Sequence, residues 1–365
     1  MEIKNPTFQI TLLWQSLFFL SFDLRILLPC PQFTLFSNLM STASSPSWRT
    51  EPLSVGDILR GSSGRSYNIE EILRHRERPL PCVYRASAQG DTYIIKDVQQ
   101  GDFDYQQELQ KPLSAAPNVR TLVDTISDRE LLVYPFLTGH LLCFMQKPVS
   151  YDLRKSILRS ALTGLAELHD RNIIHTDIKP DNILVDYDET ANQELQVRSV
   201  QIGDLESAAL LPQNAVIAGV ITGNQIWRSP EDWTRAKQDT ASDIYSFGIV
   251  AIFVVLEKMV FCPRDEAPGL YGLLMHLGEE NEYVERLGAL VPEVKPRKPF
   301  ALWEPVDPEF RDLILKMTNL DPAKRITARE ALKHPWFREA RAKDPGGLSW
   351  RRIKDYVASK LRSYM

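Results

Sequence analysis

The hydrophobic pattern changes once along the chain, and this change limits the folds that the sequence can adopt. In the first half, short apolar and β-branched runs such as 83–86 and 92–98 are typical of strands in an antiparallel sheet. From 153–168 onward, apolar residues recur at helical spacing, and 243–256 is apolar on nearly every side, as in a buried helix. The pattern predicts an α+β fold, in which a small antiparallel sheet with one helix, at 105–109, precedes a larger, mainly helical part.

The composition limits the class of protein but not its chemistry. The chain has 365 residues, of which 44% are apolar and 25% charged, which is ordinary for a soluble globular protein. Its net charge of −4, with Lys and Arg spread along the sequence, gives no reason to expect a nucleic-acid partner. Cys30, Cys82, Cys143 and Cys262 lie far apart, so neither a zinc site nor a disulfide framework is indicated. We therefore expect a reducing compartment, cytoplasmic or nuclear.

An apolar run near the N-terminus, 10–22, is followed closely by charged residues. It is shorter than the ~20 apolar residues of a membrane-spanning helix, although it is similar to the apolar region of a secretory signal. We prefer a disordered or misassigned leader, because Met40 precedes a Ser-rich, Pro-containing stretch and could itself begin the functional protein. We assign 1–55 to a leader and linker, and expect neither secretion nor membrane anchoring through 10–28.

The eight residues from His175 to Asn182, followed by an apolar strand, carry the most specific chemical signal in the sequence. They resemble the catalytic loop of eukaryotic-type protein kinases. The resemblance implies that Asp177 orients the attacking hydroxyl, that Lys179 steadies the γ-phosphate of ATP, and that Asn182 binds Mg²⁺. It also implies a structural, hydrogen-bonding role for His175. An Asp and an Asn alone would mean little, because turns are rich in both residues.

Asp204 ends a second apolar strand, in the sequence Gln-Ile-Gly-Asp-Leu-Glu. By the same resemblance it is the kinase aspartate that holds Mg²⁺ against the β- and γ-phosphates, so Asn182 and Asp204 are the expected metal ligands. The family pattern here is Asp-Phe-Gly, and Leu205 and Glu206 depart from it. This departure concerns the packing of the segment and does not contradict metal binding by Asp204.

Lys96 lies on the strand 93–96, which resembles the Val-Ala-Ile-Lys strand of protein kinases. The resemblance implies that Lys96 contacts the α- and β-phosphates of ATP, and that Glu108 on the following helix is its ion-pair partner. A lysine at a strand end is otherwise an ordinary solvated residue. Its place before the catalytic loop and its strand context favour the functional interpretation.

The segment 134–137 is expected to connect the two lobes of a kinase-like fold. By the resemblance, backbone groups of this segment, which includes Tyr134, Phe136 and Leu137, would meet the adenine, with Val83 above it. Tyr134 is a bulky residue to have beside such a pocket. These residues complete the predicted nucleotide-binding set.

Further motifs resemble kinase scaffold elements rather than catalytic ones. Ser229-Pro230-Glu231 resembles the Ala-Pro-Glu that closes the activation segment. The region 321–337 matches the last kinase helices, in which Arg325 would pair with Glu231. The scaffold motifs favour a protein over a small molecule as the substrate.

The resemblance implies an N-terminal lobe, 66–137, and a C-terminal lobe, 138–337. The remaining tail, 338–365, is basic and carries a narrow apolar stripe near helical spacing. The residues of this stripe are Trp350, Ile353, Val357 and Leu361. The stripe could suit a membrane surface or a partner protein, but a terminal helix packed on the larger lobe is the ordinary alternative, and we prefer it.

Two departures from the family pattern bear on nucleotide binding and control. The stretch 74–82, where a glycine-rich loop should precede Val83, contains no glycine, although glycines let backbone amides approach phosphates closely. We take its Arg74, Arg76 and Arg78 as a solvated basic run. Thr176 replaces the arginine that receives an activation-loop phosphate in many kinases, so control by loop phosphorylation is less expected.

Three functions remain open at this stage. The leading hypothesis is an ATP- and Mg²⁺-dependent Ser/Thr kinase of protein substrates, because tyrosine kinases generally lack a lysine at the place of Lys179. Asn224, with Thr222 as a rival, stands where Ser/Thr kinases have a threonine that bonds the catalytic Asp and Lys. The main alternative is a pseudokinase that binds or scaffolds, and a third is a small-molecule kinase. The oligomeric state does not follow from the sequence.

Overall fold

The computed structural model describes residues 52–74, 82–99, 101–190, 194–212, 215–258, 260 and 299–338. The chain divides into two compact units, 1–48 and 49–365, and every described residue belongs to the second. The predicted leader up to residue 51 and the apolar stripe of the tail, from Trp350 to Leu361, lie outside the described residues. Arg76 and Arg78 of the basic run do so as well.

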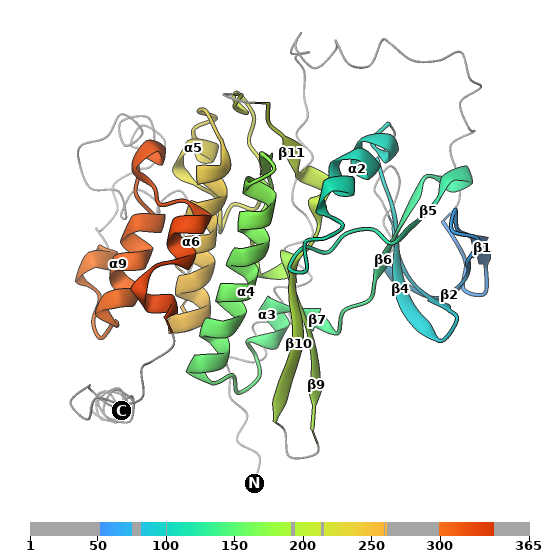
Figure 1. The fold of residues 1–365 in the computed structure, drawn as a ribbon, viewed down its shortest axis with the longest axis horizontal. Coiled ribbons are helices and arrows are strands. Elements are labelled where there is room, and N and C mark those ends of the chain that lie inside the picture. The colour runs from blue at the N-terminus through green and yellow to red at the C-terminus, as the bar shows by residue number, and fades with distance from the viewer. Residues whose placement is uncertain are drawn as a thin grey trace, which may run out of the picture. The chain divides into compact units, whose positions relative to one another are not determined.

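The N-terminal part of the fold is a six-stranded antiparallel sheet in the order β1-β2-β3-β4-β6-β5, with helix α2 beside it (Figure 1). Alternating side chains bury one face, where Tyr67, Tyr84 and Ile95 have no exposed surface. This architecture confirms the predicted small sheet with one helix. The elements are β1 Ile58–Arg60, β2 Ser66–Arg74, β3 Val83–Ala88, β4 Asp91–Asp97, α2 Phe103–Gln110, β5 Asp124–Ile126 and β6 Leu131–Pro135.

The β3–β4 hairpin sets the position of Lys96. Its two-residue loop, Gln89-Gly90, has positive φ at both residues, 55° and 92°, as a type I′ turn requires. The resulting register pairs Val83 with Lys96 across the hairpin, and Lys96 with Leu132 of β6 on its other side. Lys96 is thus carried by a central strand of the sheet rather than by a loop.

The C-terminal part is mainly helical, as the apolar periodicity predicts. Ser150 caps α4 by accepting a hydrogen bond from the Leu153 amide, and Asp239 caps α6 by accepting one from Ala241. Helix α6 is buried along almost its whole length, which confirms the prediction of a buried helix. The helices are α3 Leu141–Phe144, α4 Tyr151–His169, α5 Pro230–Trp233, α6 Thr240–Leu256, α9 Pro308–Met317 and α10 Ala328–Leu332.

Short strands beside α4 position the two motifs that carry chemistry (Figure 1). A three-stranded sheet has the order β10-β9-β7, and β8 pairs with β11. The catalytic loop connects β8 to β9, and Asp204 follows the end of β10. The bounds are β7 Gly139–His140, β8 Ile173–Ile174, β9 Ile183–Glu189, β10 Leu195–Ile202 and β11 Ala209–Leu210. Within the described ranges, none of the helices has the length and apolarity needed to span a membrane.

Candidate active site

The catalytic loop brings its three predicted residues into direct contact. Lys179 Nζ donates to Asp177 Oδ2 at 2.5 Å, and Asn182 Nδ2 donates to the same oxygen at 3.0 Å and to the Asp177 carbonyl at 2.8 Å. The other carboxylate oxygen, Oδ1, is buried and has no hydrogen-bond partner among the described residues. A buried acceptor without a donor is costly, so this oxygen is suited to receive a donor from a bound molecule.

Asp243 of α6 holds the backbone of the loop. Its Oδ2 accepts from the His175 amide at 2.8 Å, and its Oδ1 accepts from the Thr176 amide at 2.9 Å. Thr176 has a φ of 67°, a left-handed conformation that is uncommon for a β-branched residue. The two bonds to Asp243 therefore stabilise a backbone that the local sequence would not adopt alone.

His175 links the loop to the strand that carries Asp204. Its ring is fully buried, with Nε2 2.9 Å from the Gly203 carbonyl oxygen, and its Nδ1 accepts from the Asp177 amide at 3.2 Å. Since Nδ1 accepts, Nε2 carries the proton and donates to Gly203. His175 is thus a hydrogen-bonding residue of the scaffold, as expected from the sequence.

Lys96 reaches the same site from the sheet. Its Nζ donates to Asp204 Oδ1 at 2.6 Å and to Glu206 Oε1 at 3.0 Å. Burial alone would lower the pKa of Lys96, but the two carboxylates outweigh burial and raise it. Burial alone would raise the pKa of Asp204, and Lys96 overcomes this and lowers it to about 2. For Glu206, burial together with the neighbouring Asp204 prevails, and its pKa is raised.

The predicted ion pair between Lys96 and Glu108 is wrong. Glu108 pairs with Lys111 on the surface of α2, and both side chains are 67% exposed. The buried positions of α2 include Gln106, whose Nε2 donates to the Leu205 and Glu206 carbonyls at 3.2 and 3.3 Å. Glu108 therefore lies on the opposite face of the helix from the site. Glu206 supplies the second carboxylate on Lys96, a role that the sequence signalled only as a departure from the family pattern.

Buried polar side chains bond to the segment 134–137, which is the expected connection between the lobes. The Tyr134 hydroxyl accepts from Gln110 Nε2 at 3.0 Å, and the Tyr134 ring packs in a cluster with Val83 beside it. Arg120 donates to the Pro135 carbonyl through Nε at 2.9 Å and Nη2 at 2.6 Å. Burial lowers the pKa of Arg120 to about 10. The motif analysis did not single out Arg120, because it lies in a loop between elements and outside every motif.

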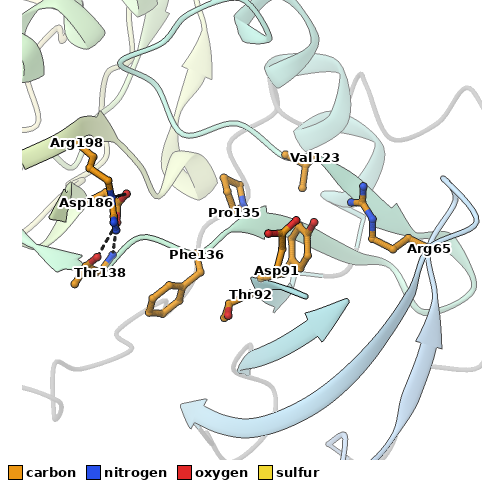
Figure 2. A pocket seen from close by; sticks show the side chains of 10 residues that line it. Arg65, Asp91, Thr92, Val123, Pro135, Phe136, Thr138, Asp186 and Arg198 are labelled. Carbon is orange, nitrogen blue, oxygen red and sulfur yellow. Dashed lines mark hydrogen bonds and ion pairs between the residues drawn. The ribbon is translucent and has the colours of Figure 1, made fainter. Parts of the chain in front are cut away.

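A pocket of about 550 Å³ lies along this connection but away from the catalytic loop (Figure 2). Figure 2 shows Phe136 at the pocket, with the ion pair between Asp186 and Arg198 at one end. Its lining does not include Lys96, Asp177 or any other residue of the catalytic set. Phe136 is 40% exposed.

The activation segment meets the catalytic loop at Gly223. This residue has a φ of 60°, and a Cβ added to it would lie 2.5 Å from the Thr176 carbonyl oxygen, so the close approach requires glycine. Thr222 is turned away from Asp177, because its amide and hydroxyl bond to Asp232. Asn224 accepts from the Ile226 amide at 3.0 Å and bonds neither Asp177 nor Lys179 within the described ranges.

The predicted ion pair between Arg325 and Glu231 is confirmed. Arg325 Nη1 donates to Glu231 Oε1 at 2.6 Å, and the two side chains are 0% and 1% exposed. Ser242 Oγ adds a bond to the same oxygen at 2.7 Å. This buried network connects α5 to the segment before α10 and fixes the end of the activation segment.

The site offers oxygen ligands for a hard cation. With Nδ2 of Asn182 committed to Asp177, its Oδ1 is left as an acceptor, and Asp204 keeps Oδ2 outside its bond to Lys96. The described residues contain no cluster of three or more His, Cys, Asp or Glu side chains that could hold a metal. This set fits Mg²⁺, which binds through one or two protein ligands, water and substrate phosphates.

Comparison with protein families agrees with this geometry. Residues 82–337 match the family model of the protein kinase domain, well over half of the chain. The matched range includes Lys96, the catalytic loop, Asp204 and the Arg325–Glu231 pair. The chain therefore belongs to the protein kinase domain family.

Proposed function

We propose that this protein transfers the γ-phosphoryl group of ATP to serine or threonine hydroxyls of protein substrates, with Mg²⁺ as cofactor. The observation that carries the proposal is the state of the Asp177 carboxylate. One oxygen is fixed by Lys179 and Asn182, and the other is buried and without a partner among the described residues. This arrangement suits a carboxylate that orients a hydroxyl and accepts its proton.

In the proposed reaction, a bond forms between the substrate hydroxyl oxygen and the γ-phosphorus, and the bond from that phosphorus to the β–γ bridging oxygen breaks. Asp177 Oδ1 accepts the hydroxyl proton, and ADP is the leaving group. Lys179 lies beside Asp177 and stabilises the transferring phosphoryl group. Asn182 and Asp204 would hold Mg²⁺, which would supply positive charge beside the transferring phosphates.

Lys96 is the proposed anchor for the α- and β-phosphates. Its raised pKa keeps it charged throughout the physiological range. Glu206 holds the ammonium group beside Asp204, the task that the resemblance assigned to Glu108. Serine and threonine are the proposed acceptors because Lys179 is present and contacts Asp177. We place the activity in a cytoplasmic or nuclear compartment, since Cys82 and Cys143 are free thiols.

Phosphopeptide formation tests this proposal. The full chain is incubated with MgATP and a library of Ser, Thr and Tyr peptides, beside the Asp177→Asn and Lys96→Met variants. The proposal predicts phosphoserine and phosphothreonine products that both variants lose. A folded wild-type chain that forms no phosphopeptide, or only phosphotyrosine, would contradict it.

A binding or scaffolding role is the second candidate, and two contacts favour it. Both Lys96 and the Pro135 carbonyl, which a nucleotide would use, are already bonded within the protein. For a protein with this role, the same assay would give no transfer while the fold is retained.

A further inference from the structure

Arg120 is a buried cation at the inter-lobe connection. Arg120 is 7% exposed, and its guanidinium carbon lies 5.0 Å from the centroid of the Tyr134 ring. Among the described residues no carboxylate lies within ion-pair distance of the guanidinium, which contacts the Pro135 carbonyl and the face of the Tyr134 ring. A guanidinium held this way depends on the Pro135 carbonyl for its hydrogen bonds.

The backbone directs Arg120 to this place. The Arg120 amide donates to the Ile202 carbonyl at 2.7 Å, next to the parallel bridge between Val119 and Ile202. The residue after Ile202 is Gly203, and a Cβ on Gly203 would lie 3.7 Å from Arg120 Cδ and 2.8 Å from a Leu184 methyl carbon. Glycine at 203 is thus required by the close approach of Leu184, while Arg120 lies at ordinary contact distance beside it.

The Pro135 carbonyl is an acceptor that the sheet leaves open. Phe136 donates its amide to the Thr92 carbonyl, so the adjacent pair, Tyr93 and Pro135, is a non-hydrogen-bonded pair of the β4–β6 ladder. In such a pair the carbonyl points away from the neighbouring strand. A carbonyl oxygen has two lone pairs, and two Arg120 N–H groups donate to this one.

We propose that Arg120 controls base recognition in the nucleotide site. By holding the Pro135 carbonyl, Arg120 occupies an acceptor on the segment that would meet the base, and a 6-aminopurine needs such an acceptor for its amino group. The nucleotide is then held mainly through its phosphates, with little distinction between a 6-aminopurine and a 6-oxopurine. This inference rests on the proposed function only in taking Lys96 and Asp204 as the phosphate and metal side of the same site.

The expected change in ATP affinity follows from the hydrogen bond that the base cannot make to the Pro135 carbonyl while Arg120 occupies it. A hydrogen bond whose loss leaves a buried group unpaired is worth roughly tenfold to hundredfold in affinity. Replacing Arg120 by an apolar residue of similar length opens the carbonyl to the base. Because no carboxylate pairs with Arg120 among the described residues, its replacement leaves no buried charge unpaired, and the variant is expected to fold.

Nucleotide affinity is the direct test, measured by calorimetry on the full chain with the Mg²⁺ complexes of ATP and ITP, which differ at position 6 of the purine. For the wild type we expect ATP and ITP dissociation constants within about threefold. For Arg120→Leu and Arg120→Met we expect ATP to bind about tenfold tighter or more, with ITP unchanged. Arg171→Leu is the control, because it removes an arginine that donates to another carbonyl, that of Pro112, and also to Glu167, and it should change neither affinity.

Several results would overturn the inference. If the wild type binds ATP tenfold or more tightly than ITP, the inference is overturned by the wild-type measurement alone. An unchanged or weaker ATP affinity in both Arg120 variants, with melting temperatures near that of the wild type, would also overturn it. Failure of both nucleotides to bind the wild type and both variants would remove the base site altogether.

The two proposals fail separately in this design, because affinity is measured without turnover. Base-indifferent binding without phosphopeptide formation would contradict the proposed function and leave the role of Arg120 intact. Phosphopeptide formation with a strong preference for ATP would do the reverse.

Discussion

The catalytic loop and the nucleotide side of the site differ in how far they follow the kinase pattern. In the loop, Asp177, Lys179 and Asn182 meet as the resemblance implies. On the nucleotide side, Glu206 takes the place expected for Glu108, and buried side chains surround the inter-lobe connection.

This difference has a physical origin in how each half is assembled. The loop residues are neighbours in sequence, and one carboxylate, Asp243, fixes the backbone at His175 and Thr176, just before them. The nucleotide side draws residues from β4, α2, β6 and the segment after β10, so a change in any one can be offset by another. A local site is thus determined by its own motif, whereas a site built from distant segments depends on packing that no motif describes.

The largest effect should follow from changing the loop itself. Asp177→Asn removes the proton acceptor but keeps a similar shape, and general-base groups contribute roughly 10²–10⁴-fold to rate. We expect phosphopeptide formation to fall about 10³-fold, while the ATP dissociation constant stays within about twofold. If the Asp177→Asn variant transfers phosphate at the wild-type rate, the loop does not carry the catalytic chemistry.

The second effect concerns the stability of the catalytic half. Arg325→Met leaves the Glu231 carboxylate buried without its partner, which should lower the free energy of unfolding by about 3–5 kcal/mol in urea titrations. The double variant with Glu231→Leu should recover much of this loss, because it leaves no buried charge unpaired.

A matched change on α2 provides the contrast. Lys111→Met breaks the exposed pair with Glu108 and should cost no more than about 0.5 kcal/mol. Equal losses in Arg325→Met and Lys111→Met would contradict the view that the catalytic half rests on a buried ionic scaffold.

The smallest effect should separate Glu206 from Glu108. Glu206→Gln removes one of the two carboxylates that contact Lys96 within the described ranges and leaves Asp204, so we expect transfer at saturating ATP to fall about tenfold. Glu108→Gln should change the rate by less than about twofold, since its carboxylate is exposed and paired with Lys111. A rate that rises in Glu206→Gln would show that Glu206 withholds Lys96 from the phosphates instead of anchoring it.

The fold was predictable because periodicity is a property of long segments. The helical spacing of 153–168 and the apolar run of 243–256 correspond to α4 and α6, and the octapeptide at His175 lies between two strands. The Arg325–Glu231 pair was predictable because both partners belong to motifs of the same family.

Other features of the site could not be read from pattern. Helix α2 spans only Phe103–Gln110, and in a helix this short the spacing of apolar residues does not show which face meets the site. The pairing expected for Glu108 therefore points to the wrong face. In the sequence Arg120 is an ordinary loop residue, and only the folded structure shows that its backbone bonds to Ile202 of β10. Thr222 and Asn224 differ by two positions, and only the close approach of Gly223 to Thr176 shows how this segment is turned.

The central claim is that the catalytic loop can transfer a phosphoryl group although the nucleotide side of the site departs from the kinase pattern. A single-turnover transfer measurement tests it most directly, with the full chain, a Ser/Thr peptide and MgATP raised to saturation. The account predicts transfer at saturation, with a half-saturating ATP concentration that falls in Arg120→Leu while the maximal rate is unchanged. A folded chain that binds MgATP at saturation and transfers no phosphoryl group to the peptide would contradict it.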